Sequence, residues 1–421
     1  MFSSPIQSFL VFDGYTSKEE GAEPVLFFAK HFSVTPPHYA VNQAGIFLTL
    51  LKFSHFFNRE QPMEYALTDK NETSILELHD NIWMTITQAY SKTTNRHLLH
   101  EILVCCKKIY NLFFPLPQRD KYGKVTKNSC RSINSVFEMI LMAITKTNLT
   151  FIHLFDSFFQ LDPKKEIMDP LTPIINEILN QNSPISHIAI MHSRNFLYSN
   201  FPVEVTRTLA ICLHIKLPYL FPQVLAKDDE RLYWIIGLSR SESGPLNVYA
   251  PPIVVNGEQL PLVALRFKKI RIILSLKKDL VPTPELLHGI PRILKPLKFH
   301  FNNLIVESVY GRFNGSYIVI INDKSKRMLQ LSNQRISDAT IPIAESNIIM
   351  AYLFARQVGP SSQVAFTGTV NHFIFFNTNY YEKEVIVLCK TETREISKSL
   401  SIIGNLLEPA NIQMFKIKNT K

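Results

Sequence analysis

A hairpin of two short apolar segments followed by a helical segment occurs three times along this chain, and the recurrence limits the possible folds more than any other feature. Further strands and helices follow each time before the next hairpin. Strands joined by tight turns favour an antiparallel sheet with helices packed on its faces. At 421 residues the chain also exceeds what one hydrophobic core usually serves. The sequence therefore predicts three α/β (α+β) domains, each an antiparallel sheet flanked by helices.

The first unit begins with two apolar runs, 8–12 and 25–29, separated by a polar loop, which predict a hairpin. Apolar residues at i, i+3, i+4 and i+7 then predict a helix over 39–57. The remaining patterns predict strands at 64–69, 74–78 and 82–90, and helices at 98–114 and 133–159.

The two later units repeat this order without close sequence repetition. The second is predicted to contain a hairpin at 186–199, a helix at 203–217, a strand at 232–238, a Pro-rich connection at 248–261, a strand at 269–276 and a helix at 284–302. The third is predicted to contain a hairpin at 311–332, a helix at 345–356, strands at 372–378 and 384–391, and a helix at 393–407.

The predicted helix at 39–57 is apolar nearly all round. Ile46, Leu50, Phe53 and Phe57 lie opposite the apolar residues expected to face a sheet. A helix on one face of a sheet needs only one apolar side, so we expect a second cover over this helix. The chain has 30 Phe, most of which are expected in cores, while some suit surfaces covered by a partner chain.

The net charge of +10 favours an anionic partner, which charge alone leaves open as nucleic acid, phospholipid or acidic protein. The five Cys are odd in number and lack CxxC spacing, which argues against a disulfide framework or a zinc site and suits a reducing compartment. The longest apolar run is too short to span a bilayer, so any membrane association is expected to be peripheral.

The basic stretch 266–278 is the strongest local charge feature. Read as a strand, it alternates apolar residues with basic ones, so one face is expected to be basic. That face is either an ordinary solvated surface or a contact for anionic phosphoinositide headgroups. The basic residues proposed for it are Lys269, Arg271, Lys277 and Lys278.

Motifs of enzymes and nucleotide-binding proteins are missing from the sequence. There is no Walker A loop, no G-x-G-x-x-G after a strand, no H-E-x-x-H and no GxSxG. We therefore expect no catalytic residue, no cofactor and no metal. A nucleic-acid partner is not expected either, because no recognition motif or basic helix accompanies the charge.

Several short segments, taken in order, resemble one known family. They are SFLVFD at 8–13, KEEG at 18–21, VLFF at 25–28, NIWM at 81–84, CCKKIYNLF at 105–113 and FFQLD at 158–162. Together they resemble the calcium-caffeine-zinc sensitivity (CCZ) proteins, which pair with a monensin-sensitivity (Mon) protein to make a late-endosomal and vacuolar fusion factor.

The resemblance implies three longin-like domains, at 1–165, 184–305 and 308–421. It implies a heterodimer with a Mon family protein that acts as a guanine-nucleotide exchange factor for a Rab GTPase of the late-endosomal Rab-seven class. It also implies a cytoplasmic protein recruited peripherally to late-endosomal, lysosomal or vacuolar membranes. We assign the partner-facing or Rab-facing surface to the first helix, with Asn42, Gln43, Gly45, Ile46, Leu50 and Phe53 as the candidate residues.

Three alternatives stay open. The chain could be a non-catalytic longin-domain adaptor or tethering subunit of another trafficking complex, because triple-longin families of organelle biogenesis and planar polarity share the architecture. Gly45 either permits a close approach by a partner or is a tolerated Gly in a core helix, where it costs about 1 kcal/mol relative to Ala. Trp83 is interpreted as core packing in preference to a contact residue.

Overall fold

The structure of the chain is a computed structural model. It describes residues 6–14, 25–32, 36, 38–57, 63–90, 96–114, 116–146, 158–159, 165–180, 183–192, 195–215, 217, 233–240, 246–302, 317–323, 328–331, 364–367, 373–380 and 383–390. The chain divides into two compact units: Met1–Leu149 with Asp169–Leu304, and Thr150–Met168 with Ile305–Lys421. Within the described residues the strands form three sheets, two in the first unit and one in the second. The predicted class, antiparallel sheets flanked by helices, is confirmed.

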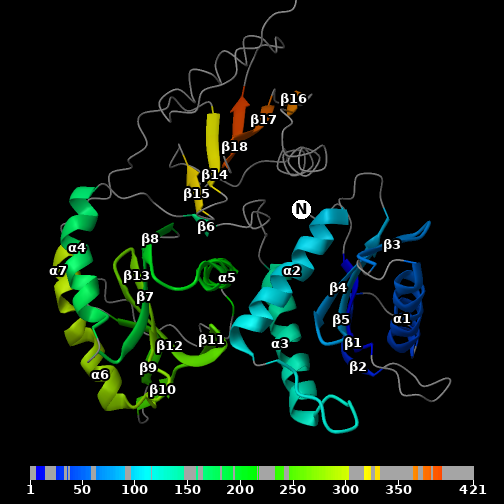
Figure 1. Ribbon diagram of the computed structural model, residues 1–421, viewed down its shortest axis with the longest axis horizontal. Helices are drawn as coiled ribbons and strands as arrows, with labels where there is room; N and C mark the ends of the chain where they lie inside the picture. The colour runs from blue at the N-terminus through cyan, green and yellow to red at the C-terminus, as the bar shows by residue number, and fades with distance from the viewer. Residues whose placement is uncertain are drawn as a thin grey trace, which may run out of the picture. The chain divides into compact units, whose positions relative to one another are not determined.

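The first sheet has the strand order β2-β1-β5-β4-β3, and all its neighbours are antiparallel. Its strands are β1 (Ile6–Asp13), β2 (Leu26–His31), β3 (Tyr65–Leu67), β4 (Asn71–His79) and β5 (Ile82–Ala89). Helix α1 (Tyr39–Phe57) lies on one face, and α2 (Arg96–Phe113) and α3 (Lys127–Lys146) lie on the other (Figure 1). The predicted hairpin and first helix are confirmed.

The core between α1 and the sheet is built from residues at helical spacing on α1 and at alternate positions on the strands. Ala44, Phe47, Leu48 and Leu51 pack against Leu10, Phe12, Ile75 and Trp83. The Trp83 side chain is 9% exposed. The interpretation of Trp83 as a core residue is therefore confirmed.

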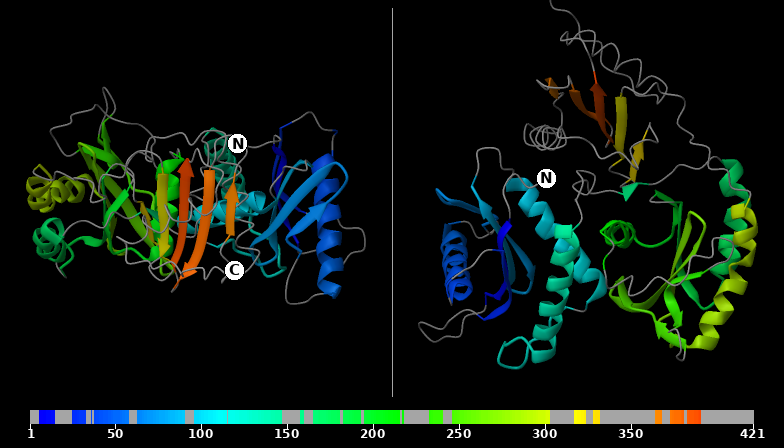
Figure 2. Two further views of the ribbon diagram at one scale, coloured as in Figure 1. Left: turned by 90° about the horizontal axis from the view of Figure 1, so that it is seen from above. Right: turned by 180° about the vertical axis from the view of Figure 1, so that it is seen from behind.

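The second sheet has the order β10-β9-β12-β13-β7-β8, and β11 also pairs with β12. Its elements are β7 (Ile185–His192), β8 (Asn195–Ser199), β9 (Tyr233–Arg240), β10 (Leu246–Tyr249), β11 (Pro252–Val255), β12 (Glu258–Phe267) and β13 (Ile270–Leu276). Helix α5 (Val203–His214) lies on one face; α4 (Lys165–Ile178), α6 (Pro284–Ile293) and α7 (Lys295–Asn302) lie on the other (Figure 2).

The predicted Pro-rich connection at 248–261 is wrong, because most of it forms strands β10, β11 and β12. Asn256 and Gly257 have φ values of 51° and 82° and form the tight turn between β11 and β12. An Asn-Gly pair between apolar residues is a strong hairpin signal. The prolines lie where a sheet tolerates them, since Pro252 begins β11 and faces Pro261 across the ladder.

Helix α2 contacts strands on one side and a helix on the other. It packs on β4 and β5 of the first sheet, and also contacts α5 and β11 of the second. Its buried side chains point in both directions and include Leu99, Ile102, Leu103, Cys105, Cys106, Ile109, Tyr110, Leu112 and Phe113. Helix α2 is therefore shared by the cores of both sheets of the first unit.

The third sheet has the order β16-β17-β18-β14-β15-β6. Its strands are β6 (Phe158–Phe159), β14 (Tyr317–Asp323), β15 (Met328–Leu331), β16 (Val364–Thr367), β17 (Phe373–Tyr380) and β18 (Lys383–Lys390). Residues 158–159 were expected in a helix of the first domain; instead they pair in parallel with β15. The helices predicted at 345–356 and 393–407 lie outside the described residues.

Candidate protein-interaction surface on the first helix

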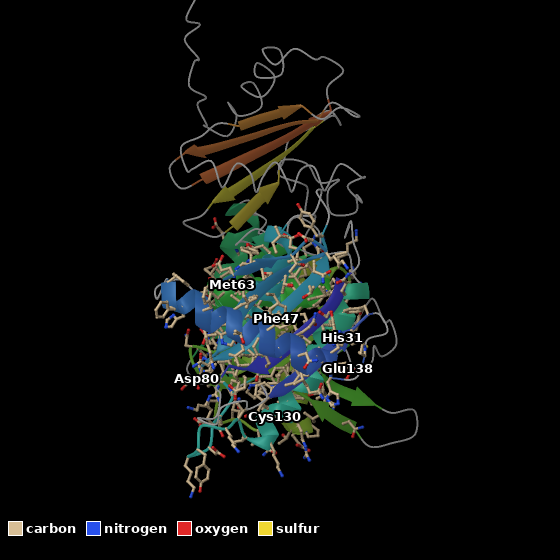
Figure 3. All side chains as sticks on the ribbon, turned by 90° about the vertical axis from the view of Figure 1, so that its right-hand side faces the viewer. His31, Phe47, Met63, Asp80, Cys130 and Glu138 are labelled. Atoms are coloured by element: carbon tan, nitrogen blue, oxygen red, sulfur yellow. The ribbon has the colours of Figure 1, made fainter. Side chains whose placement is uncertain are left out.

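Helix α1 follows the β1–β2 hairpin and lies flat on the first sheet. It turns Ala44, Phe47, Leu48 and Leu51 toward the strands. Figure 3 views this face of the domain, with α1 crossing in front of the sheet and Phe47 near the middle of the helix. The sheet buries one side of α1. The opposite side is available to a partner if no other part of the described chain covers it.

The side of α1 that points away from the sheet is apolar and exposed. Its large apolar side chains, called the α1 apolar face below, are Ile46 (58% exposed), Leu50 (36%), Phe53 (62%), Phe56 (82%) and Phe57 (71%). Four of them follow the spacing i, i+4, i+7 and i+11, which places them in one stripe along the helix. The sequence predicted this stripe, and only Phe56 was not part of the prediction.

The α1 apolar face is unfavourable in water. Covering a large apolar side chain stabilises a complex by about 2 kcal/mol, and contiguous exposed apolar patches mark interaction sites in soluble proteins. Near the end of the helix the Phe53 and Phe57 rings lie 4.8 Å apart, and the Phe56 and Phe57 rings 5.6 Å apart, both edge to face. The three rings thus form one aromatic surface.

Asn42 and Gly45 lie beside the N-terminal half of the α1 apolar face. The Asn42 side chain is exposed. A Cβ added at Gly45 would meet no atom within 4 Å, so the packing of this chain gives no reason for a glycine there. The Gly45 carbonyl accepts a hydrogen bond from the Thr49 hydroxyl at 2.9 Å, within the helix. Space above a helical glycine permits the backbone of another chain to come close.

Gln43 was predicted on the partner-facing side, and the structure places it elsewhere. Its Oε1 accepts a hydrogen bond from the Ser8 hydroxyl on β1 at 3.4 Å, and its Nε2 donates to the Tyr39 hydroxyl at 2.9 Å. Position 43 lies four residues before the buried Phe47, so the two side chains share the sheet side of the helix. Gln43 therefore holds α1 on the sheet.

The four basic residues predicted on one strand face do not form a continuous surface. Lys269 lies in the β12–β13 turn and Arg271 at the start of β13, whereas Lys277 and Lys278 follow the other end of β13. Between them Ser275 is fully buried. The prediction of a basic face is wrong because β13 is a central strand, paired with β12 and β7 and covered on both faces.

The described part of the chain lacks the features of a metal site and of a membrane-spanning helix. It contains no cluster of three or more His, Cys, Asp or Glu side chains suited to a metal ion. No helix in that part is long and apolar enough to cross a membrane.

Comparison with known proteins bears on the domain that carries this surface. Residues 6–115 match a family model described as the first longin domain of INTU, CCZ1 and HPS4. A search of curated proteins finds no match. The matched residues contain the whole first sheet with α1 and α2, and thus the whole α1 apolar face. The first domain of this chain is therefore similar to the first longin domain of INTU, CCZ1 and HPS4.

Proposed function

We propose that the chain is one subunit of a heterodimeric guanine-nucleotide exchange factor for a late-endosomal Rab GTPase of the Rab-seven class, acting in endosome–lysosome or vacuole fusion. Its proposed partner is a protein of the Mon family, as the resemblance to the CCZ proteins implies. The observation that carries the proposal is the α1 apolar face on a longin domain of the INTU, CCZ1 and HPS4 kind.

The second sheet of the same unit suggests what covers α1. Helix α5 follows the β7–β8 hairpin as α1 follows the β1–β2 hairpin, and it too lies on one face of its sheet. Unlike α1, it is covered on its outer side by α2 of the first longin domain. Buried residues on α5 include Val205, Leu209, Ile211, Cys212 and Leu213. By this precedent, the occupant of the α1 apolar face is another longin domain, supplied by the partner chain.

An exchange factor of this kind needs no nucleophile, metal or cofactor. It works by binding the nucleotide-free GTPase more tightly than the nucleotide-bound form, which shifts the GTPase toward release. Asn42, Gly45 and Ile46 are the residues we propose where the interface with the partner's longin domain borders the joint surface offered to the GTPase. They lie on the first half of α1, whereas the aromatic rings lie at its end.

Peripheral association with anionic, phosphoinositide-containing membranes is part of the proposal. The basic residues at the two ends of β13 lie in two separate pairs, Lys269 with Arg271 and Lys277 with Lys278. Lys278 also forms an ion pair with Glu258 at 3.2 Å, with both side chains more than half exposed. Because Glu258 offsets the charge of Lys278, these pairs attract an anionic surface only weakly, and the proposed membrane association calls for a further basic site.

The test is co-purification of the chain with the Mon family protein, followed by release of labelled nucleotide from a panel of Rab GTPases. The proposal expects the pair to form and to accelerate release from the late-endosomal Rab, with neither subunit sufficient alone. A pair that forms and accelerates no Rab would favour the alternative, a longin-domain adaptor or tethering subunit. Failure of the pair to form would contradict the assignment to the CCZ proteins.

A further inference from the structure

The loop between α2 and α3, residues 116–126 and here called the α2–α3 loop, is held together by its own hydrogen bonds. Arg119 and Val125 pair as an antiparallel bridge, and Thr126 donates its backbone N–H to the Gln118 carbonyl at 2.9 Å. At the tip, Asp120 Oδ1 accepts the backbone N–H groups of Tyr122 and Lys124 at 2.8 and 2.9 Å. Figure 1 shows the loop extending beyond the ends of the two helices.

The base of this loop is fixed to the first sheet by Arg119. Its guanidinium donates to both Asp13 carboxylate oxygens at 2.9 Å each, to Asp80 Oδ2 at 2.7 Å and to the Gly123 carbonyl at 2.8 Å. The loop therefore holds its tip in place before any partner binds, so binding would cost little ordering entropy.

The tip presents positive charge around one aromatic ring. Lys121 and Lys124 of the loop and Lys127 at the start of α3 are exposed, and the Tyr122 side chain is 68% exposed. The Lys121 ammonium lies 5.0 Å from the centre of the Tyr122 ring. One oxygen of the neighbouring carboxylate, Asp120 Oδ1, is engaged by the backbone of the loop itself.

We propose that the α2–α3 loop is a preformed contact for an anionic membrane surface, with Lys121, Lys124 and Lys127 on lipid headgroups and the Tyr122 ring in the headgroup layer. Tyrosine favours this layer because its ring is apolar and its hydroxyl polar, and lysines near an anionic leaflet are attracted to it. The inference rests on the peripheral membrane association proposed above and adds a site to it.

A membrane fits this tip better than an acidic protein does. A stable protein interface buries about 800 Å² on each partner, which calls for a broad surface. A short loop with one exposed ring and two exposed ammonium groups, with a third at the start of α3, offers little area for that purpose. The same few groups suffice at a headgroup layer, where each basic side chain acts separately on a continuous anionic surface.

The experiment compares the full chain with two double variants in vesicle co-sedimentation, using phosphatidylcholine alone and phosphatidylcholine mixed with phosphatidylserine. The loop variant is Lys121→Ala with Lys124→Ala. The control is Lys70→Ala with Lys295→Ala, which removes the same charge from exposed lysines of a β3–β4 turn and of α7. The two lysine side chains removed from the loop make none of the hydrogen bonds described above, so the loop is expected to keep its shape.

The proposal expects the loop variant to bind the phosphatidylserine vesicles roughly twenty-five-fold more weakly than the unaltered chain, at about five-fold per lysine, while the control binds as the unaltered chain does. It also expects Tyr122→Ala to weaken binding at high salt, where the charges are screened. Equal losses in loop variant and control would overturn it, because net charge alone would then explain binding.

Other outcomes separate this inference from the proposed function. If the unaltered chain binds the vesicles and the loop variant binds equally well, the inference fails and membrane association stands. If no variant binds, membrane association fails with it. If the loop variant binds vesicles as the unaltered chain does but no longer binds an acidic protein partner, the loop is a protein contact and the inference is overturned. Nucleotide exchange measured without vesicles should be the same for all variants.

Discussion

Among single residues, Arg119 joins three segments that are far apart in the sequence. Its guanidinium bonds Asp13 at the end of β1, Asp80 in the β4–β5 turn and Gly123 in its own loop. The Asp13 side chain is 5% exposed and that of Arg119 is 14% exposed, so solvent screens this pair only weakly. Such a pair fixes geometry, because removing either member leaves the other charge buried.

Replacing Arg119 with Ala is expected to lower the free energy of unfolding by roughly 3 kcal/mol, since the Asp13 carboxylate keeps its burial and loses its bidentate partner. Urea unfolding measures the change. Arg131→Ala is the matched control, because that arginine is exposed on α3 and should change stability by no more than about 0.5 kcal/mol. Equal effects of the two substitutions would contradict a special role for Arg119.

Two glycines of the first domain should respond in opposite ways to Ala. A Cβ at Gly14 would lie 2.7 Å from Trp83 Nε1 and 2.8 Å from the Asn81 carbonyl oxygen. Gly14→Ala should therefore destabilise the chain by about 2 kcal/mol. Gly45→Ala has open space and should raise helix stability by up to about 1 kcal/mol. Thermal unfolding distinguishes the two.

If Gly45 permits close approach, Gly45→Ala should also weaken co-purification with the Mon family partner, although it stabilises the isolated chain. A variant that is more stable and still pairs normally would leave Gly45 as a tolerated helix glycine. The combination of the two measurements thus separates the two interpretations that the sequence left open.

His187 predicts a pH dependence of stability. Burial lowers the pKa of His187, which donates or accepts at Ser275 Oγ, 2.9 Å away, and stacks on Phe201. Because the folded pKa lies below the ordinary value of 6.5, the unfolded chain binds more protons between the two values. The free energy of unfolding should be at its full value above pH 6.5 and fall as the pH drops below it.

Urea unfolding at several pH values from neutral downward checks this. His187→Gln should flatten the decline, although His31 and His192, whose pKa values burial also lowers, keep part of it. His288→Gln is the control because this side chain is exposed on α6. A decline that is unchanged in the His187 variant would assign it to other groups.

Among the elements, α1 was predicted from the sequence at its observed bounds because its apolar spacing is strong and prolines precede it. The β11–β12 hairpin was missed because its prolines outweighed the Asn256-Gly257 turn signal. The basic face of β13 was wrong because alternation alone does not reveal that a strand is central and covered on both faces. Helix α2 was found, but its contacts with α5 depend on tertiary packing that no local pattern encodes.

The two sides of α1 yield a prediction for the helix as a whole. Ile46→Asp places a charge on the exposed side, so it should leave the free energy of unfolding within about 0.5 kcal/mol and abolish pairing with the partner. Phe47→Ala, one position along, removes a buried ring and should cost about 3–5 kcal/mol. Unimpaired pairing of the Ile46 variant would remove the α1 apolar face from the interface.

In the first unit as a whole, the packing of α2 between the two sheets should control how readily the buried cysteines are alkylated. Cys105 and Cys106 on α2 and Cys212 on α5 are buried. Burial raises the pKa of Cys105 to about 11 and raises the pKa values of Cys106 and Cys212 as well. Thiolates are the reactive form. These three thiols should therefore be alkylated only when the two sheets of the unit separate or unfold.

Mass spectrometry after brief alkylation at mild alkaline pH measures this order. The half-exposed Cys130 near the start of α3 should be modified first, and the three buried thiols should follow together as urea approaches the unfolding midpoint. Early modification of Cys105 and Cys212 in the absence of urea would show that the contact between α2 and α5 opens independently of global unfolding.

The bonds that Arg119 makes to Asp13 and Asp80 also limit where a fragment containing the first domain can end. The family match ends at residue 115, which invites expression of a fragment with that boundary. Such a fragment would keep Asp13 and Asp80 and lose the arginine that forms ion pairs with both, together with α3 and its packing on β2. A fragment reaching residue 146 retains all of these but exposes the side of α2 that packs on α5, so we expect a stable, monodisperse protein only when the second sheet of the unit is included.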